Sequence, residues 1–96
     1  MHAVVRTYAG GAARDFFDLL DERKAEIESL IRSVEGFESY TLIKTDDGGI
    51  SVTVCQDKKG TDQSVKLARL WRQRNAAKLG LKRPTVSEGS AILQLC

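Results

Sequence analysis

The order in which hydrophobic patterns follow one another along the chain restricts it to few folds. Short runs rich in β-branched and aromatic residues alternate with longer stretches whose apolar residues recur every three or four positions. The first pattern is typical of strands and the second of amphipathic helices. The predicted elements are a strand at Ala3–Tyr8, a helix at Asp15–Val34, strands at Phe37–Thr45 and Ile50–Asp57, a helix from Gly60-Thr61 to Gly80, and a last strand within Val86–Leu95.

Turn residues separate these patterns. Asp46–Gly49 reads DDGG between two strand patterns, and an Asp-Gly pair accepts positive φ at little cost, so a hairpin is predicted there. Thr61 or Asp62 is the expected N-cap of the second helix. Gly80 and Pro84 end that helix, the first by tolerating a left-handed conformation and the second by lacking an amide proton.

The order β-α-β-β-α-β predicts a ferredoxin-like α+β fold, with a four-stranded antiparallel sheet and two helices on one face. Ninety-six residues suffice for one domain, so residues 1–96 are predicted to form a single domain.

The other face of such a sheet lacks helices, yet strand alternation leaves neither face freely polar. A sheet that is partly apolar on both sides usually has a partner on the second one, and a homodimer burying sheet against sheet is the simplest arrangement. The alternating sets are Ala3, Val5 and Thr7 against Val4, Arg6 and Tyr8; Phe37, Thr41 and Ile43 against Tyr40 and Leu42; and Ile50, Val52 and Val54 against Ser51, Thr53 and Cys55.

Composition excludes several classes of protein. No apolar run approaches the ~20 residues that a bilayer requires, so no membrane association is expected. Two cysteines, Cys55 and Cys96, form neither a disulfide framework nor a zinc motif and fit a reducing cytoplasm. The single histidine, His2, is expected at a solvated terminus and cannot belong to a multi-histidine metal site. Without a Gly-rich phosphate loop or a Ser-His-Asp set, we expect no metal and no cofactor.

Charge is unevenly distributed. Residues 58–83 contain nine basic residues and one acid, whereas the rest of the chain is acidic. A solvated helix face is the simpler explanation, and contact with phosphates is the alternative. An RNA-recognition module of the same topology needs aromatic residues on its strands for base stacking, and the third strand here offers Ser, Val, Thr and Cys. Nucleic acid therefore ranks below the other partners considered.

Three segments resemble a known family: GFESYTLIKTDDGGISVTVCQD, SVKLARLWRQRNAAKLG and PTVSEGSAIL. They are similar to small antibiotic-biosynthesis-monooxygenase-like proteins of the dimeric α/β-barrel superfamily, over residues 15–95. The resemblance is most specific at Gly36-Phe37 with Tyr40, at Trp71 with Asn75, and from Pro84 to Glu88-Gly89.

The resemblance implies a homodimer whose two sheets face each other in a barrel. Relatives include cofactor-independent mono-oxygenases of polycyclic aromatics, haem-degrading enzymes and proteins without known activity. The haem-degrading branch uses an Asn on the first strand and a His about ten residues after the tryptophan. This chain has no Asn on its first strand and Leu81 in place of the His, so haem degradation is not expected.

Five residues are candidates for a ligand pocket. Arg23 lies on the apolar stripe of the first helix, where its charge needs a salt bridge, a route to solvent, or an anionic or phenolate ligand. Trp71 and Asn75, at positions i and i+4, lie on one side of the second helix, either lining a pocket or packing in the core. Tyr8 and Tyr40, together with Arg6, offer polar groups to a pocket or to a dimer interface.

Two classes of function remain open. The first is a cofactor-independent mono-oxygenase-like enzyme acting on a small aromatic or quinone-like compound, with the substrate supplying the electrons for oxygen. The second is a non-catalytic homodimer that binds a small ligand or another protein. An enzyme requires an enclosed pocket that Arg23 and Asn75 reach, and a packed interior favours the second class.

Overall fold

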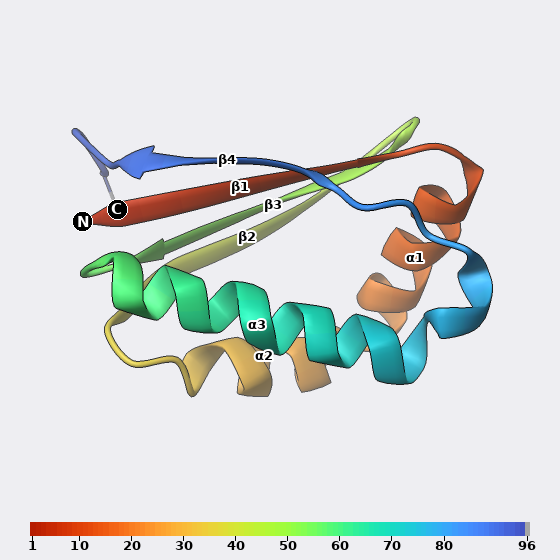
Figure 1. Cartoon of the computed structure of the whole chain (residues 1–96), viewed down its shortest axis with the longest axis horizontal. Coiled ribbons are helices and arrows are strands. Elements are labelled where there is room, and N and C mark those ends of the chain that lie inside the picture. The colour runs from red at the N-terminus through yellow and green to blue at the C-terminus, as the bar shows by residue number, and fades with distance from the viewer. Residues whose placement is uncertain (96) are drawn as a thin grey trace.

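The computed structural model describes residues 1–95 and shows one four-stranded sheet with helices on one face (Figure 1). Cys96 lies outside the described residues. The elements are β1 (His2–Ala9), α1 (Gly11–Glu22), α2 (Lys24–Arg32), β2 (Phe37–Thr45), β3 (Gly48–Cys55), α3 (Lys58–Asn75), the single 3-10 turn η1 (Ala77–Leu79) and β4 (Thr85–Ser90).

The strands are antiparallel and lie in the order β2-β3-β1-β4. The two central strands, β1 and β3, are therefore far apart in sequence. They become neighbours because both helical connections cross the same face of the sheet. This arrangement confirms the predicted ferredoxin-like α+β fold. Among residues 1–95, no helix combines the length and the apolar character that crossing a membrane requires.

The predicted helix at Asp15–Val34 is wrong in one respect, because it is two helices. Arg23 has φ −110° and ψ 24°, outside helical values, and separates α1 from α2. Its carbonyl accepts hydrogen bonds from the amides of Glu26 and Ile27, which begins the second helix. The bend lets α1 cover β3 while α2 continues beneath α3 (Figure 1).

The second predicted helix also begins earlier and ends earlier than expected. Asp57, not Thr61 or Asp62, is the N-cap of α3, and its carboxylate accepts a hydrogen bond from the Gly60 amide at 3.3 Å. Gly60 lies inside the helix, and this position requires glycine because a Cβ there would stand 2.5 Å from the Glu35 carbonyl oxygen. After α3 ends, η1 follows, and Gly80 adopts the predicted left-handed conformation.

The predicted hairpin is confirmed, with Asp46 and Asp47 as its turn between β2 and β3. A bulge at the start of β2, between Phe37 and Ser39, changes one predicted side-chain direction. Because of it, Phe37 shares the helix-covered face with Tyr40 rather than the open face, so its predicted grouping with Thr41 and Ile43 is wrong.

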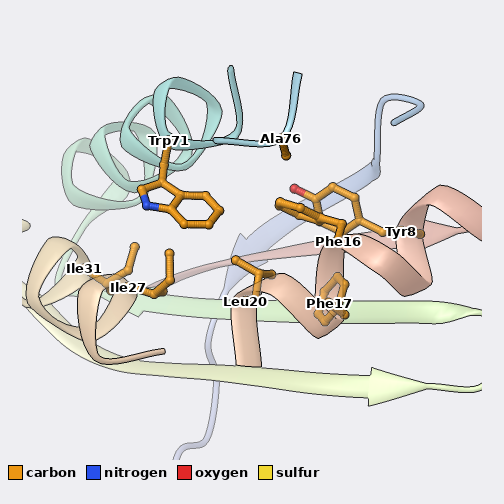
Figure 2. Packing of buried hydrophobic residues seen from close by; sticks show 9 residues of the cluster. Tyr8, Phe16, Phe17, Leu20, Ile27, Ile31, Trp71 and Ala76 are labelled. Carbon is orange, nitrogen blue, oxygen red and sulfur yellow. The ribbon is translucent and has the colours of Figure 1, made fainter. Parts of the chain in front are cut away.

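The register shows which strand residues the helices cover. Val4, Arg6 and Tyr8 of β1 face the helices, together with Ser51, Thr53 and Cys55 of β3. Helices α1 and α2 supply most of the apolar core that packs on them. Figure 2 shows Trp71, Ile27 and Ile31 at one end of this core, and Tyr8, Phe16 and Phe17 at the other, with Leu20 between.

The opposite face of the sheet carries no helix. Its central residues, Val5, Ile50 and Val52, are partly exposed. The segment after β4 returns to this face, where the Gln94 side-chain amide donates to the Ser39 hydroxyl at 3.0 Å. The three large apolar residues of that segment are exposed: Ile92 at 97 %, Leu93 at 76 % and Leu95 at 84 %.

Candidate functional site

A small cavity lies between the sheet and the helices. Its volume is about 20 Å³, enough for about one water molecule. Strand residues supply the polar groups on one side of it, and helix residues supply apolar walls on the other. The lining residues are Arg6, Tyr8, Tyr40, Leu42 and Ser51 from the strands, and Phe16, Phe17, Leu20, Ile27, Leu30, Ile31, Ala68 and Trp71 from the helices.

Arg6 is the charged group of this cavity. It lies in the centre of β1, and strand alternation turns its side chain toward the helices between Val4 and Tyr8. The residue is 4 % exposed. Its Nε donates to the Ser51 hydroxyl at 3.2 Å, and no carboxylate of residues 1–95 forms an ion pair with it. A buried charge without a counter-ion is costly to the fold, which makes this residue the most unusual feature of the interior.

Two tyrosines stand beside Arg6. Burial raises the pKa of Tyr40, and this effect exceeds the lowering by the neighbouring Arg6 guanidinium. Tyr40 is therefore a neutral hydroxyl donor at neutral pH. Tyr8 is buried, and its ring packs against Phe16 and Phe17 at centroid distances of 5.4 and 5.6 Å. Both residues were predicted as pocket candidates, and both line the cavity.

Trp71 of α3 was predicted as a pocket candidate, and it forms part of the cavity wall. Its indole N–H donates to Oε1 of Glu26 at 2.8 Å, which ties α3 to α2. The other oxygen of that carboxylate accepts from Nε and Nη2 of Arg23 at 2.9 and 2.6 Å. The Trp71 hydrogen bond, followed by the Arg23 contacts, holds the pKa of Glu26 below its ordinary value.

Arg23 and Asn75 do not line the cavity. The Arg23 guanidinium lies over the Trp71 ring, 5.6 Å from its centroid, and donates to Oδ1 of Asn75 at 3.3 Å. The Asn75 side-chain amide donates back to the Trp71 carbonyl at 2.9 Å. These two predicted site residues therefore join α1, α2 and α3 behind the tryptophan, and Arg23 forms a salt bridge with Glu26, one of the three arrangements expected from its sequence position.

An open groove adjoins the cavity along the edge of the sheet. It has a volume of about 280 Å³ between α2 and β2. Ile27, Ile31, Tyr40 and Leu42 line both spaces. Outward displacement of α2 from β2 would therefore join groove and cavity into one larger pocket.

A second polar cluster lies at the other end of β1. His2 is not at a solvated terminus, and that prediction is wrong: its Nδ1 is 2.7 Å from the Thr61 hydroxyl, and its Nε2 is 3.4 Å from Oε1 of Glu88. Cys55 beside it is fully buried, and burial raises the pKa of its thiol, so it is no nucleophile at neutral pH. Within residues 1–95, no three His, Cys, Asp or Glu side chains gather as metal ligands.

The basic residues of α3 form a separate surface. Lys58 pairs with Asp62 and Glu88, at 3.0 and 2.8 Å. In the described part of the chain, the basic side chains from Lys59 to Arg83 form no ion pair. Lys66 and Arg69 are exposed on this face, which agrees with the solvated helix face expected from the sequence.

Two polar residues of the cavity were less apparent in the sequence. Arg6 was one of three polar groups named for a pocket or an interface, and only its position inside an apolar strand distinguished it. Ser51 carried no signal, because serine on a half-buried strand is common. The register brings them together, since Arg6 and Ser51 are direct partners on β1 and β3.

Comparisons with known proteins give the fold a context. No model of a known protein family matches the chain, and no curated protein matches it in sequence. Several solved structures share its fold at low sequence identity. The similarity therefore concerns the fold.

A monooxygenase from the gene ActVA-Orf6 of Streptomyces coelicolor, solved with nanaomycin D, is 20% identical with a TM-score of 0.64, over 99% of this chain and 89% of that chain. SnoaB, a cofactor-independent oxygenase from Streptomyces nogalater, is 18% identical with a TM-score of 0.57, over 98% and 93%. A dimeric ferredoxin-like protein from an uncultured marine organism is 14% identical with a TM-score of 0.65, over 99% and 95%. These similarities confirm the predicted ferredoxin-like fold.

Proposed function

We propose that this chain is a cofactor-independent mono-oxygenase-like enzyme that acts on a small aromatic or quinone-like compound between its sheet and its helices. One observation carries the proposal. A charged guanidinium and the hydroxyl donors of Tyr40 and Ser51 meet inside a cavity otherwise walled by aromatic and aliphatic side chains. A pocket of this composition suits a planar ring with oxygen substituents. The fold shared with two oxygenases supports the same reaction class.

The residues have distinct roles in this reaction. Trp71 and Phe16, whose rings lie 6.4 Å apart, would hold the substrate ring. Tyr40, kept neutral by burial, would donate to the oxygen that becomes negative when the substrate loses a proton. The ionised ring then reduces O₂: a ring CH₂ becomes C=O, and the second oxygen atom leaves as water. The substrate supplies all four electrons, so the protein needs to position and stabilise an anion.

We propose further that the chain works as a homodimer through the open face of its sheet. Val5, Ile50 and Val52 place apolar side chains at the centre of this face. The exposed apolar residues after β4 border it. A second copy would cover both, and the dimeric ferredoxin-like protein of the same fold supports this assembly.

We also propose that the chain works in the reducing cytoplasm, because Cys55 is a buried free thiol.

Oxygen uptake tests the enzymatic proposal. The purified protein is supplied with a panel of anthrones, which carry the ring CH₂ that the reaction oxidises, without flavin and with a metal chelator present, and oxygen is followed with an electrode. We expect uptake that depends on the protein and that falls about 10²-fold in kcat in Tyr40→Phe, which removes one donor to the oxyanion. Arg69→Met, on the outer face of α3, serves as the control variant. Absence of protein-dependent uptake across the panel would contradict the proposal.

The second candidate is a non-catalytic dimer that binds a small ligand or another protein. Two observations favour it: the cavity volume is about 20 Å³, which a substrate ring exceeds, and neither Arg23 nor Asn75 lines the cavity. Here the same compounds would not be oxidised, and only a ligand that binds outside this cavity would raise the melting temperature, since ligand binding to the native state alone stabilises it.

A further inference from the structure

The uncompensated charge of Arg6 indicates what kind of ligand the cavity takes. The cavity lining contains no Asp and no Glu. Within the described residues, Arg6 donates from Nε to the Ser51 hydroxyl and lies within side-chain hydrogen-bond reach of Tyr40, and both of these partners are neutral. Removing one partner of a buried ion pair leaves an uncompensated charge that strongly destabilises a fold. Arg6 carries such an uncompensated buried charge. A bound anion would supply the missing counter-ion.

The geometry of the guanidinium restricts the anion. A guanidinium is planar and presents its N–H groups as a fork that matches the two oxygens of a carboxylate. Because Nε donates to Ser51, an anion would bind to the two terminal nitrogens, beside or in place of their contact with Tyr40. Tyr40 stands beside them as a neutral hydroxyl and can donate to one of the same oxygens.

We propose that the cavity binds an aromatic carboxylate, with the carboxylate on the terminal nitrogens of Arg6 and the ring packed against Trp71 and Phe16. The inference rests on the binding step of the proposed function and is independent of the oxidation. A phenol reaches the site uncharged at neutral pH, whereas a carboxylic acid is ionised and matches a guanidinium that is charged at every physiological pH. The aromatic walls favour a ring as the body of the ligand.

The ligand reaches Arg6 from the groove between α2 and β2. That groove shares Ile27, Ile31, Tyr40 and Leu42 with the cavity, and α2 buries only Ile27 and Ile31. Glu26 links α2 to Trp71, which packs on Phe16, so entry of the ligand requires α2 and the Trp71 side chain to move outward together. The proposed ligand-bound site is therefore wider than the ligand-free cavity of about 20 Å³.

A matched pair of ligands tests the proposal. 2-Naphthoate and 2-naphthamide have the same shape, and only the first is charged. Isothermal titration calorimetry on the wild-type protein should show naphthoate binding about 10- to 100-fold more tightly than the amide, the range of a charge-assisted hydrogen bond. Arg6→Met should remove this preference, and Arg6→Lys should restore it in part. Equal affinity of the two compounds, or binding of neither, would overturn the proposal.

Two further readouts separate the cavity from the basic surface of α3. Arg69→Met removes the same charge from that surface and should leave naphthoate affinity unchanged. Affinity should vary little between low and moderate salt, since buried pairs are poorly screened, whereas adventitious binding to α3 would weaken steeply. A loss of affinity in Arg69→Met equal to that in Arg6→Met would contradict the assignment.

Stability gives a test that needs no ligand. Arg6→Met exchanges an uncompensated buried charge for an apolar side chain of similar length, so the ligand-free variant should unfold at the same or a higher temperature than wild type. A large drop would show that Arg6 is structural and would overturn the proposal. Naphthoate binding without oxygen uptake would contradict the oxygenase proposal and support the carboxylate site. Oxygen uptake with a neutral anthrone that does not depend on Arg6 would support the oxygenase and contradict the carboxylate site.

Discussion

Glu26 connects two helices through a single carboxylate, because one oxygen accepts from Trp71 and the other from Arg23. Its pKa is held below the ordinary value of 4.5. A carboxylate with a lowered folded-state pKa contributes stability that is present above the unfolded pKa and lost as the pH falls through the folded one. This contribution is therefore complete at neutral pH and disappears in acid below about pH 4.5.

Glu26→Gln should accordingly lower the melting temperature at pH 7 and flatten its decline in acid. Thermal unfolding followed by circular dichroism from pH 3 to pH 7 measures both effects. Glu28→Gln is the matched control, since it lies on the same helix and loses an exposed pair with Arg32 that contributes little. Because the amide oxygen of glutamine can still accept from Trp71, equal effects of the two substitutions would show that the charge of Glu26 adds no more stability than an exposed carboxylate does.

At the scale of residues, the sequence predicted part of the site. Tyr8, Tyr40 and Trp71 were predicted as pocket candidates, and they line one cavity because aromatic residues on a covered face must converge on the core. Arg23 was assigned to the pocket from its place on the apolar stripe. The stripe could not show that the helix bends at that residue, which leaves its guanidinium on the outer side of Trp71.

At the scale of the elements, α1 packs closely on β3 at a glycine of that strand, Gly49. A Cβ on Gly49 would stand 2.3 Å from the Phe17 ring, so the ring lies directly on the backbone of the strand. This contact fixes the depth at which α1 packs, and with it the position of Phe16 and Leu20 above the cavity.

Gly49→Ala should therefore cost about 1–3 kcal/mol of unfolding free energy, as overpacked cores do. Gly89→Ala is the matched control, because it is also a strand glycine and a Cβ there meets nothing within 4 Å. That change should stay within about 0.5 kcal/mol. Urea denaturation of both variants measures the difference, and a neutral Gly49→Ala would contradict this close packing of ring on strand.

The order of the elements was predictable, whereas their breaks were not. The hairpin at Asp46–Asp47 followed from its turn chemistry, which is local. The division at Arg23 did not, since the apolar stripes of α1 and α2 have the same spacing and only packing on different parts of the sheet separates them. The bulge that turns Phe37 inward depends likewise on pairing with β3. The sequence also grouped Arg6 with Val4 and Tyr8, and only the tertiary fold shows that the helices cover this group.

For the whole molecule, the proposed homodimer makes the sharpest prediction. Val52 lies at the centre of the open face, paired with Val5 on one side and Thr41 on the other. Val52→Glu would place an unpaired charge in a dry interface between two sheets, which opposes association. We expect a dimer for wild type and a monomer for the variant in light scattering at micromolar concentration.

Lys66→Glu changes charge on the exposed face of α3 and should remain dimeric. A monomeric wild-type protein would contradict the dimer itself. That the chain forms a single domain over residues 1–96 stays a prediction.

The central position of β1 has a consequence for how the protein is made. During synthesis, at roughly 5–20 residues per second, β1 emerges before both of its neighbours in the sheet. Val4 must wait for Thr53 and then for Glu88 before both of its edges are paired. Such distant pairing slows folding, and the nascent chain keeps an apolar strand with open edges for most of its translation. A ribosome-associated chaperone that shields extended segments would therefore raise the yield of folded protein more for this chain than for a helical bundle of equal length.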